Sequence, residues 1–215
     1  MCELYAANSR EPQLLNETLR LFYQHSVRHP HGWGLAYWER GQAVLEREER
    51  SALDSEWLRR ILDQPIVSGM ALAHIRFATV GAIGLENCHP FVGEDASGRT
   101  WTLIHNGTIF SGTKLLPYEA KQRGRTDSER VLLYLLDCMD EARERTGAPL
   151  SAAERFSVLD QVVRDLAPRN KLNLLIYDGE QLYVHMNMRG TLFSARHNGG
   201  CFFVTAPLEN AFSWQ

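Results

Sequence analysis

The sequence predicts a layered α+β fold in which two antiparallel β-sheets carry helices on their outer faces. The predicted elements follow the order strand, helix, a run of strands, two helices, and more strands. Strands and helices do not alternate regularly, which argues against a parallel doubly wound sheet. The 215 residues suffice for one substantial core, and no shift in composition marks a boundary. We therefore expect a single domain over residues 1–215.

The N-terminal part predicts a strand, a helix and a hairpin. The first eight residues alternate in polarity and predict a half-buried strand. Residues 9–27 predict a helix, with Ser9 as a candidate N-cap and Pro12 near the first turn. Apolar runs on both sides of Gly41 predict a hairpin over residues 33–48.

The central part predicts one short helix and two apolar strands. Residues 54–64 have the pattern of an amphipathic helix that stops before Pro65. Residues 69–77 and 99–107 predict strands, and the second strand closes on Asn106-Gly107. The Asn-Gly pair is the strongest short signal for a hairpin turn.

The C-terminal half predicts two helices followed by strands. The clearest helix begins at Thr126, which could form a capping box with Glu129, and ends before Gly147. Residues 151–167 predict a second helix that stops at Pro168. The remaining apolar segments predict four short strands, over residues 172–179, 181–187, 191–196 and 201–206.

Composition excludes several classes of function. The net charge is −3 and no run of basic residues is present, so we expect no nucleic-acid partner. No apolar run approaches the ~20 residues of a membrane helix, and the N-terminus lacks the pattern of a secretory signal. The cysteines are far apart and form no C-x-x-C pair, as expected for reduced thiols in the cytoplasm: Cys2, Cys88, Cys138 and Cys201.

Polar residues gather at the ends of the predicted strands, and each has a structural explanation when it is taken alone. Asn106-Gly107 could be a turn, and Asp127 could offset the positive end of a helix dipole. His74 and His105, within apolar strands, could be hydrogen-bonded core residues, and Arg76 could belong to an ordinary ion pair.

Taken together, these residues indicate a catalytic site. If Met1 is removed, Cys2 offers a thiol and a free α-amine on one residue. The amine, with a reference pKa of ~7.7–8.0, can act as the base for a thiol whose reference pKa is ~8.5. Such a nucleophile needs oxyanion donors, and the Asn106 amide with the Gly107 N–H could supply two.

Two charged residues suggest the substrate. Arg76 could bind a carboxylate through two hydrogen bonds, and Asp127 could bind an ammonium group. A molecule that carries both of these groups and an amide is a glutamine-like amino acid.

These residues resemble the class II, or N-terminal nucleophile (Ntn), glutamine amidotransferases, of the stand-alone glutaminase-domain type. The resemblance covers almost the whole chain and depends on the order and spacing of five segments: Met1-Cys2, His74–Thr79, Asn87–Phe91, His105–Gly107 and Thr126–Glu129. It implies a four-layer αββα sandwich of two antiparallel sheets. It also implies an amidohydrolase, for which we expect no cofactor or metal, and the cysteine pattern and missing signal favour the cytoplasm.

The resemblance implies hydrolysis of the glutamine side-chain amide to glutamate and ammonia, with a synthase partner as a possible acceptor of the ammonia. It assigns a role to each candidate residue: Cys2 as the nucleophile with its own amine as the base, Asn106 and Gly107 as the oxyanion hole, Arg76 for the substrate carboxylate, Asp127 for its ammonium, and Thr79 with the Gly32-Trp33-Gly34 loop as pocket lining. Many relatives carry Asp before Gly-Trp-Gly, where this chain has His31.

Three alternatives stay open at this stage. The enzyme could cleave a γ-glutamyl conjugate other than glutamine, because the same amino-acid end would be bound. It could be a non-catalytic amino-acid-binding subunit if Met1 is retained. A metal site is the third alternative, although the spacing of its candidate ligands matches no zinc pattern: Cys2, His74, Cys88, His89 and His105.

Overall fold

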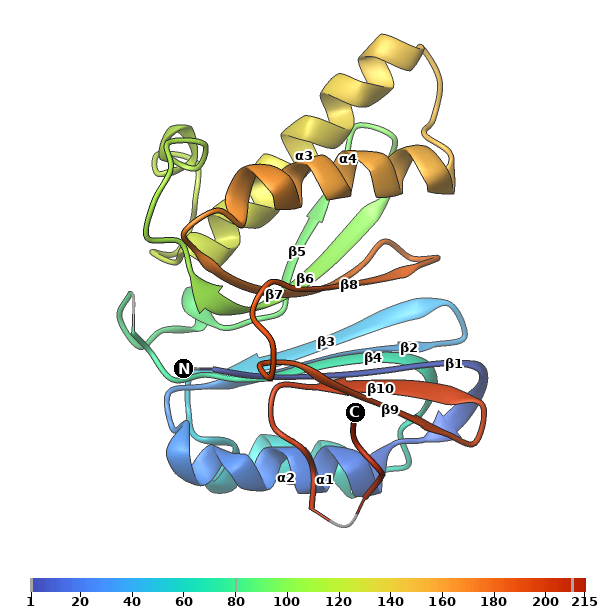
Figure 1. Ribbon diagram of the computed structural model, residues 1–215. Coiled ribbons are helices and arrows are strands. Elements are labelled where there is room, and N and C mark those ends of the chain that lie inside the picture. Colours follow the sequence, from blue (N-terminus) through green and yellow to red (C-terminus); the bar gives the residue numbers. More distant parts are fainter. Residues whose placement is uncertain (1, 80, 210) are drawn as a thin grey trace. The chain divides into compact units, whose positions relative to one another are not determined.

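The computed structural model describes residues 2–79, 81–209 and 211–215. The chain divides into two compact units, of which unit 1 comprises Met1–Pro90 and Arg189–Gln215 and unit 2 comprises Phe91–Met188. Each unit contains one antiparallel sheet and a pair of α-helices (Figure 1). This confirms the predicted α+β class with two antiparallel sheets.

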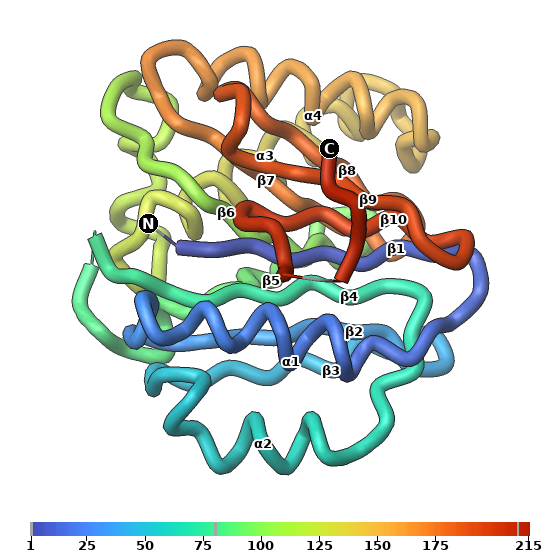
Figure 2. The backbone as a smooth tube through the Cα atoms, turned by 60° about the horizontal axis from the view of Figure 1, so that its bottom comes forward, coloured from blue at the N-terminus to red at the C-terminus, as the bar shows by residue number. Residues whose placement is uncertain are grey.

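Unit 1 is built on a six-stranded sheet in the order β3-β2-β4-β1-β10-β9. Two helices, α1 (Asn16–Gln24) and α2 (Glu56–Leu62), cover one face of this sheet (Figures 1 and 2). Its strands are β1 (Glu3–Leu14), β2 (Trp33–Glu39), β3 (Gln42–Glu48), β4 (Val67–Ile75), β9 (Phe193–His197) and β10 (Gly200–Val204). Short 3₁₀ helices at His25–Arg28, Ala52–Asp54 and Leu85–Asn87 complete the unit.

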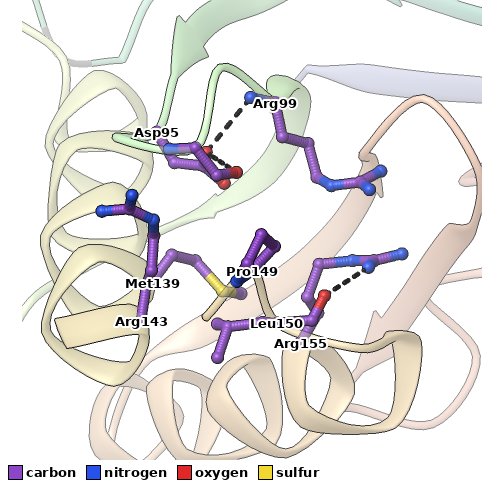
Figure 3. A pocket seen from close by; sticks show the side chains of 8 residues that line it. Asp95, Arg99, Met139, Arg143, Pro149, Leu150 and Arg155 are labelled. Atoms are coloured by element: carbon purple, nitrogen blue, oxygen red, sulfur yellow. Dashed lines mark hydrogen bonds between the residues drawn. The ribbon is translucent and has the colours of Figure 1, made fainter. Parts of the chain in front are cut away.

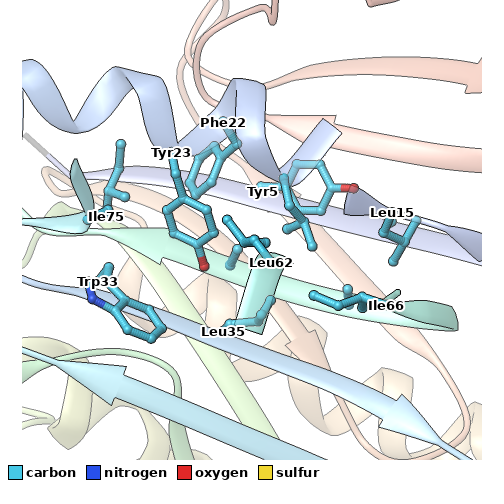
Figure 4. Close-up of a cluster of buried hydrophobic side chains, with 14 of the residues drawn as sticks. Tyr5, Leu15, Phe22, Tyr23, Trp33, Leu35, Leu62, Ile66 and Ile75 are labelled. Carbon is cyan, nitrogen blue, oxygen red and sulfur yellow. The ribbon is translucent and has the colours of Figure 1, made fainter. Parts of the chain in front are cut away.

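The core of unit 1 lies between the sheet and these helices. Tyr5 and Ala7 of β1 point into it, since alternate residues of a strand share a face. Phe22 of α1 packs against Tyr5 with ring centroids 5.6 Å apart (Figure 4). Trp33 of β2 is fully buried in the same cluster.

The predicted helix start at Ser9 is wrong. Strand β1 continues through Leu14, and helix α1 begins only at Asn16. The ladder between β1 and β4 is irregular between Asn8 and Gln13, and Pro12 lies in this interval. Proline is tolerated there because a missing N–H removes no ladder bond. The hairpin between β2 and β3 is confirmed, with Gly41 at φ +81° in its turn.

Unit 2 is built on a four-stranded sheet in the order β5-β6-β7-β8. Its strands are β5 (Phe91–Glu94), β6 (Thr100–Thr108), β7 (Lys171–Tyr177) and β8 (Leu182–Met186), and its helices are α3 (Asp127–Thr146) and α4 (Ala152–Leu166) with a 3₁₀ turn at Leu116–Tyr118. Apolar residues of α3 and α4 pack against the sheet in one cluster. Strand β5 has only four residues and was not predicted.

The predicted C-cap of α3 is confirmed, whereas the predicted capping box at its start forms only in part. Gly147 ends α3 in the left-handed conformation, and Ser151 with Glu154 forms a capping box for α4. At the start of α3, Thr126 accepts a bond from the N–H of Glu129, but Glu129 does not return it. Its carboxylate instead accepts from two N–H groups of the preceding loop, each at 2.8 Å.

The C-terminal residues return to the edge of the unit 1 sheet. Backbone bonds of 2.9 and 3.0 Å join Gln215 and Ser194 of β9, and Figure 2 shows this segment beside the strand. Within the residues that the structure describes, no helix is both long enough and apolar enough to cross a lipid bilayer.

Candidate active site

In unit 1, Cys2 and Arg76 lie at the same end of the sheet. The register of β1 on β4 pairs Glu3 with Ile75, so the residues that extend each strand are Cys2 and Arg76. The thiol of Cys2 is partly exposed and donates to the carbonyl oxygen of Phe77 at 3.6 Å. The expectation that Met1 is removed concerns a residue outside the described part of the chain.

The backbone of Arg76 is fixed by the segment that precedes β2. Its N–H donates to the carbonyl of Gly32 at 2.8 Å, and its carbonyl accepts from the N–H of His31 at 3.0 Å. The side chain is only 2% exposed. The planar fork of a guanidinium suits two parallel hydrogen bonds to an anionic group such as a carboxylate.

Cys88 is a second thiol in this region, and its chemistry differs from that of Cys2. Burial raises the pKa of Cys88 to about 11, although the positive charges of Arg76 and Arg47 oppose this shift. Cys88 therefore remains a protonated thiol near neutral pH, and a protonated thiol is a poor nucleophile.

The Gly32-Trp33-Gly34 segment packs closely against Cys88 and His89. A Cβ on Gly32 would lie 2.6 Å from the sulfur of Cys88, and one on Gly34 would lie 1.8 Å from the carbonyl oxygen of His89. The ring of Trp33 points the other way, into the unit 1 core, where its Nε1 donates to Glu48 at 3.1 Å (Figure 4). Only the backbone of Trp33 is thus available for a pocket.

His31 contacts Ala78, the residue that precedes Thr79. Nδ1 of His31 accepts from the N–H of Ala78 at 2.9 Å, which requires a ring with its proton on Nε2. An Asp at this position would offer the same kind of acceptor to the loop. The side chain of Thr79 is exposed, on the loop that follows β4.

In unit 2, Asn106 and Gly107 are part of strand β6. They pair with Asn173 and Leu172 of β7, so the hairpin-turn reading of Asn106-Gly107 is wrong. A Cβ on Gly107 would lie 1.9 Å from the carbonyl oxygen of Lys171, which leaves room only for glycine. Asn106 is 3% exposed, and its Oδ1 accepts from Nδ2 of Asn173 at 3.1 Å.

Asp127 is the first residue of α3, and it connects that helix to the end of β6. Its Oδ2 accepts from the N–H of Ile109 at 2.7 Å, and its residue is 7% exposed. A carboxylate has two oxygens, so Oδ1 can serve a second donor. This arrangement fixes the position of the carboxylate relative to the Asn106-Gly107 strand within unit 2.

The histidines near these residues are buried. Nδ1 of His105 lies 2.9 Å from Oγ of Ser128. Burial lowers the pKa of His105, and the nearby charge of Asp127 only partly opposes this shift, so the ring is neutral at neutral pH. In unit 1, the rings of His74 and His89 stack with centroids 4.0 Å apart. These contacts are those of core histidines.

Sequence reasoning missed Asn173 and Ser128, the residues that contact Asn106 and His105. A signal for Asn173 was present, because it is the one amide in the apolar run of Lys171–Tyr177. An amide buried in an apolar strand needs a hydrogen-bond partner. Ser128 had no comparable signal, since serine is common in the first turn of a helix.

A small cavity in unit 2 lies apart from the candidate residues. Its volume is about 30 Å³, where a single water molecule needs ~10–15 Å³ of such space. Figure 3 shows its lining, which consists of Asp95, Ser97, Arg99, Met139, Arg143, Pro149, Leu150 and Arg155. Arg155 is bound to Asp178 at 2.7 Å and to Glu180 at 2.6 Å. The cavity is therefore too small for an amino acid. Of the residues that line it, Arg155 is already paired with these two carboxylates.

Within residues 2–79, 81–209 and 211–215, no three or more His, Cys, Asp or Glu side chains are grouped so that they could hold a metal ion. The metal-site alternative thus has no set of ligands in this part of the chain.

Comparison with known proteins identifies a family. The family profile described as "Glutamine amidotransferases class-II" matches residues 1–200. "Putative glutamine amidotransferase YafJ" from Escherichia coli K12 is 28% identical over 188 residues, which are 86% of this chain and 72% of that protein. The chain spans smaller shares, 63% and 52%, of related proteins from Haemophilus influenzae and Methanocaldococcus jannaschii.

Solved structures show the same fold. A "predicted glutamine amidotransferase" from Pseudomonas aeruginosa has a TM-score of 0.66 and 23% identity, and the match covers 100% of this chain and 93% of that one. Glutamine phosphoribosylpyrophosphate amidotransferase from Bacillus subtilis has a TM-score of 0.65 and 17% identity, with 95% of this chain and 42% of that one covered. These matches confirm the predicted fold class.

Proposed function

The chain belongs to the class II glutamine amidotransferases, enzymes of the N-terminal nucleophile type, and we propose that it hydrolyses the side-chain amide of glutamine with Cys2 as the nucleophile. The observation that carries this proposal is the register of β1 on β4, which brings the Cys2 thiol and the buried Arg76 to one end of the unit 1 sheet. A nucleophile and a binding group for an α-carboxylate then share one rigid support.

The proposed reaction begins with a proton transfer within Cys2. After Met1 is removed, the α-amine accepts the thiol proton, and the thiolate attacks the amide carbon of glutamine. The negative charge that develops on the amide oxygen is stabilised by Nδ2 of Asn106 and the N–H of Gly107. The protonated amine then gives its proton to the departing ammonia, and water hydrolyses the thioester to release glutamate.

The amino-acid end of the substrate is bound by charge. Arg76 binds the α-carboxylate, and the guanidinium suits this task because it offers two parallel N–H donors. Asp127 binds the α-ammonium through Oδ1, while Oδ2 keeps its bond to Ile109. We also assign Thr79 and the backbone of Gly32-Trp33 to the lining of the substrate pocket.

The released ammonia has an acceptor in the proposed scheme. We propose that a synthase partner in the cytoplasm takes up the ammonia. The B. subtilis amidotransferase supports this idea, because the chain corresponds to 42% of that protein and the rest is further sequence. The cysteines are widely spaced and form no disulfide within the described residues, which supports a reducing compartment.

The test combines turnover with the intact mass of the protein. Protein beginning at Cys2 should release glutamate and ammonia from glutamine and gain one adduct from a glutamine-analogue electrophile. Cys2→Ala should abolish both results while the fold is retained. Hydrolysis that persists in Cys2→Ala would refute the mechanism, and faster turnover of γ-glutamyl anilides or thiol conjugates than of glutamine would reassign the substrate.

A further inference from the structure

Two asparagines face each other in the sheet of unit 2. Asn173 of β7 is fully buried and pairs in register with Asn106 of β6. Nδ2 of Asn173 donates to Oδ1 of Asn106 at 3.1 Å. Both residues belong to the same compact unit.

This bond determines which end of the Asn106 amide faces Asn173. A primary amide carries its acceptor at one end and its donors at the other, and only the NH₂ end can donate to an oxyanion. Because the NH₂ group of Asn173 needs an acceptor, Oδ1 of Asn106 turns toward it. A 180° rotation of the Asn106 amide would set two NH₂ groups against each other inside a buried sheet, which is unfavourable.

The position of Asn173 is unusual for its residue type. The five central residues of β7 are all buried, and the four others are leucine or isoleucine. An amide in such a strand loses its hydration on folding, so its hydrogen bonds must compensate. A leucine would fill this position without that requirement.

We propose that Asn173 is the positioning residue of the oxyanion hole, in that it holds the Asn106 amide with its NH₂ end available to the substrate. This inference rests on the proposed function, because it requires Asn106 to donate to the amide oxygen of glutamine. Asn173 itself does not touch the substrate. Its effect should therefore appear in kcat, since the donor is needed most when charge develops on the amide oxygen.

The decisive variant is Asn173→Asp, because a carboxylate offers acceptors only. Oδ1 of Asn106 would then face another hydrogen-bond acceptor. The Asn106 amide should therefore rotate, so that its Nδ2 donates to the carboxylate and its oxygen faces the oxyanion. We expect kcat to fall about 10²–10³-fold, as for the loss of one oxyanion donor. KM should stay within about threefold of the wild-type value, because ground-state binding is not removed.

Asn173→Ala removes the restraint without inverting the amide, so its kcat should lie between those of wild type and Asn173→Asp, about tenfold down. Tyr183→Phe is the matched control, since it also removes one buried hydrogen bond of this sheet, the 2.9 Å bond to Asp178. It should lower the thermal midpoint and leave kcat unchanged. If Asn173→Asp does not fold, Asn173→Ala and Asn173→Ser carry the same comparison without a charge.

The outcomes separate this inference from the proposed function. If the wild-type protein shows no Cys2-dependent hydrolysis of glutamine, both are refuted. If wild type is active and the folded Asn173 variants keep its kcat, or change KM alone, only the positioning role is refuted. The order wild type, Ala, Asp in falling kcat, together with an unchanged kcat in Tyr183→Phe, supports it.

Discussion

The carboxylate of Glu3, the residue that follows Cys2, lies 2.6 Å from Nδ1 of His25. The hydrogen bond and the charge of Glu3 raise the pKa of His25, and the charge of Glu209 adds to this rise. Partial burial and the charge of Arg28 oppose the rise. The strand that follows the proposed nucleophile is thus joined to the end of α1 by a pair whose strength depends on pH.

We predict that this pair stabilises the protein more at acidic than at alkaline pH. A histidine whose pKa is higher in the folded state gives stability that is complete below its unfolded value, about 6.5, and is lost as the pH rises through the folded value. Glu3→Gln should therefore lower the thermal midpoint at pH 6 and have less effect at pH 8.5. The matched control is Glu11→Gln, an exposed position of the same strand. A pH-independent effect of Glu3→Gln would contradict the prediction.

Arg76→Lys should weaken substrate binding more than it slows chemistry. An ammonium cannot reproduce the two parallel donors of a guanidinium, so we expect KM for glutamine to rise about 10–100-fold. Arg155→Lys is the control, because Arg155 is equally buried but bound to Asp178 in unit 2. It should lower the thermal midpoint without a change in KM. If Arg76→Lys lowers only the thermal midpoint, Arg76 is a structural residue.

Asn106→Ala should reduce kcat by about 10²–10³-fold with a smaller effect on substrate affinity, because it removes one donor of the oxyanion hole. Steady-state kinetics and a separate binding measurement on Cys2→Ala protein can distinguish the two quantities. Asn16→Ala serves as a control. In the described residues, the side-chain amide of Asn16 forms its hydrogen bonds with backbone groups around α2. A loss of affinity with kcat unchanged would assign Asn106 to binding.

Gly107→Ala should destabilise unit 2 strongly. The added Cβ would meet the carbonyl oxygen of Lys171 at 1.9 Å, a backbone atom that can move only if β6 and β7 separate. We expect a loss of about 3 kcal/mol or more in the free energy of unfolding, measured with denaturant. Gly93→Ala of the same sheet meets the side-chain end of Leu136 at 2.6 Å and should lose about 1 kcal/mol. Equal losses would show that the backbone contact at Gly107 relaxes.

Local signals in the sequence predicted local structure correctly. The C-cap at Gly147 and the turn at Gly41 act over a few residues, so a window of sequence contains the whole cause. The helix start at Ser9 failed because the partners of β1 lie far along the chain, in β4 and β10. A strand is chosen by such distant pairing, which outweighs a favourable capping residue.

The candidate site shows the same division. Residue types and their order made Asn106 and Gly107 candidates, but the turn propensity of Asn-Gly was overridden by pairing with β7. The direction of the Trp33 ring could not be read from its neighbours, because a strand with apolar residues on both faces has no pattern that marks the core side. Asn173 became significant only when the register placed it beside Asn106.

The close approach at Gly32 and Gly34 has a consequence for how this sequence can change over evolutionary time. A Cβ at Gly34 would meet the backbone of His89, and one at Gly32, where φ is +135°, would meet the sulfur of Cys88, so packing and backbone conformation require both glycines. Libraries of variants selected only for folding, with no demand for catalysis, should retain glycine at both positions. Invariance of Gly-Trp-Gly among homologues would then reflect purifying selection on chain packing, and a degenerate member that had lost its nucleophile would still carry the motif.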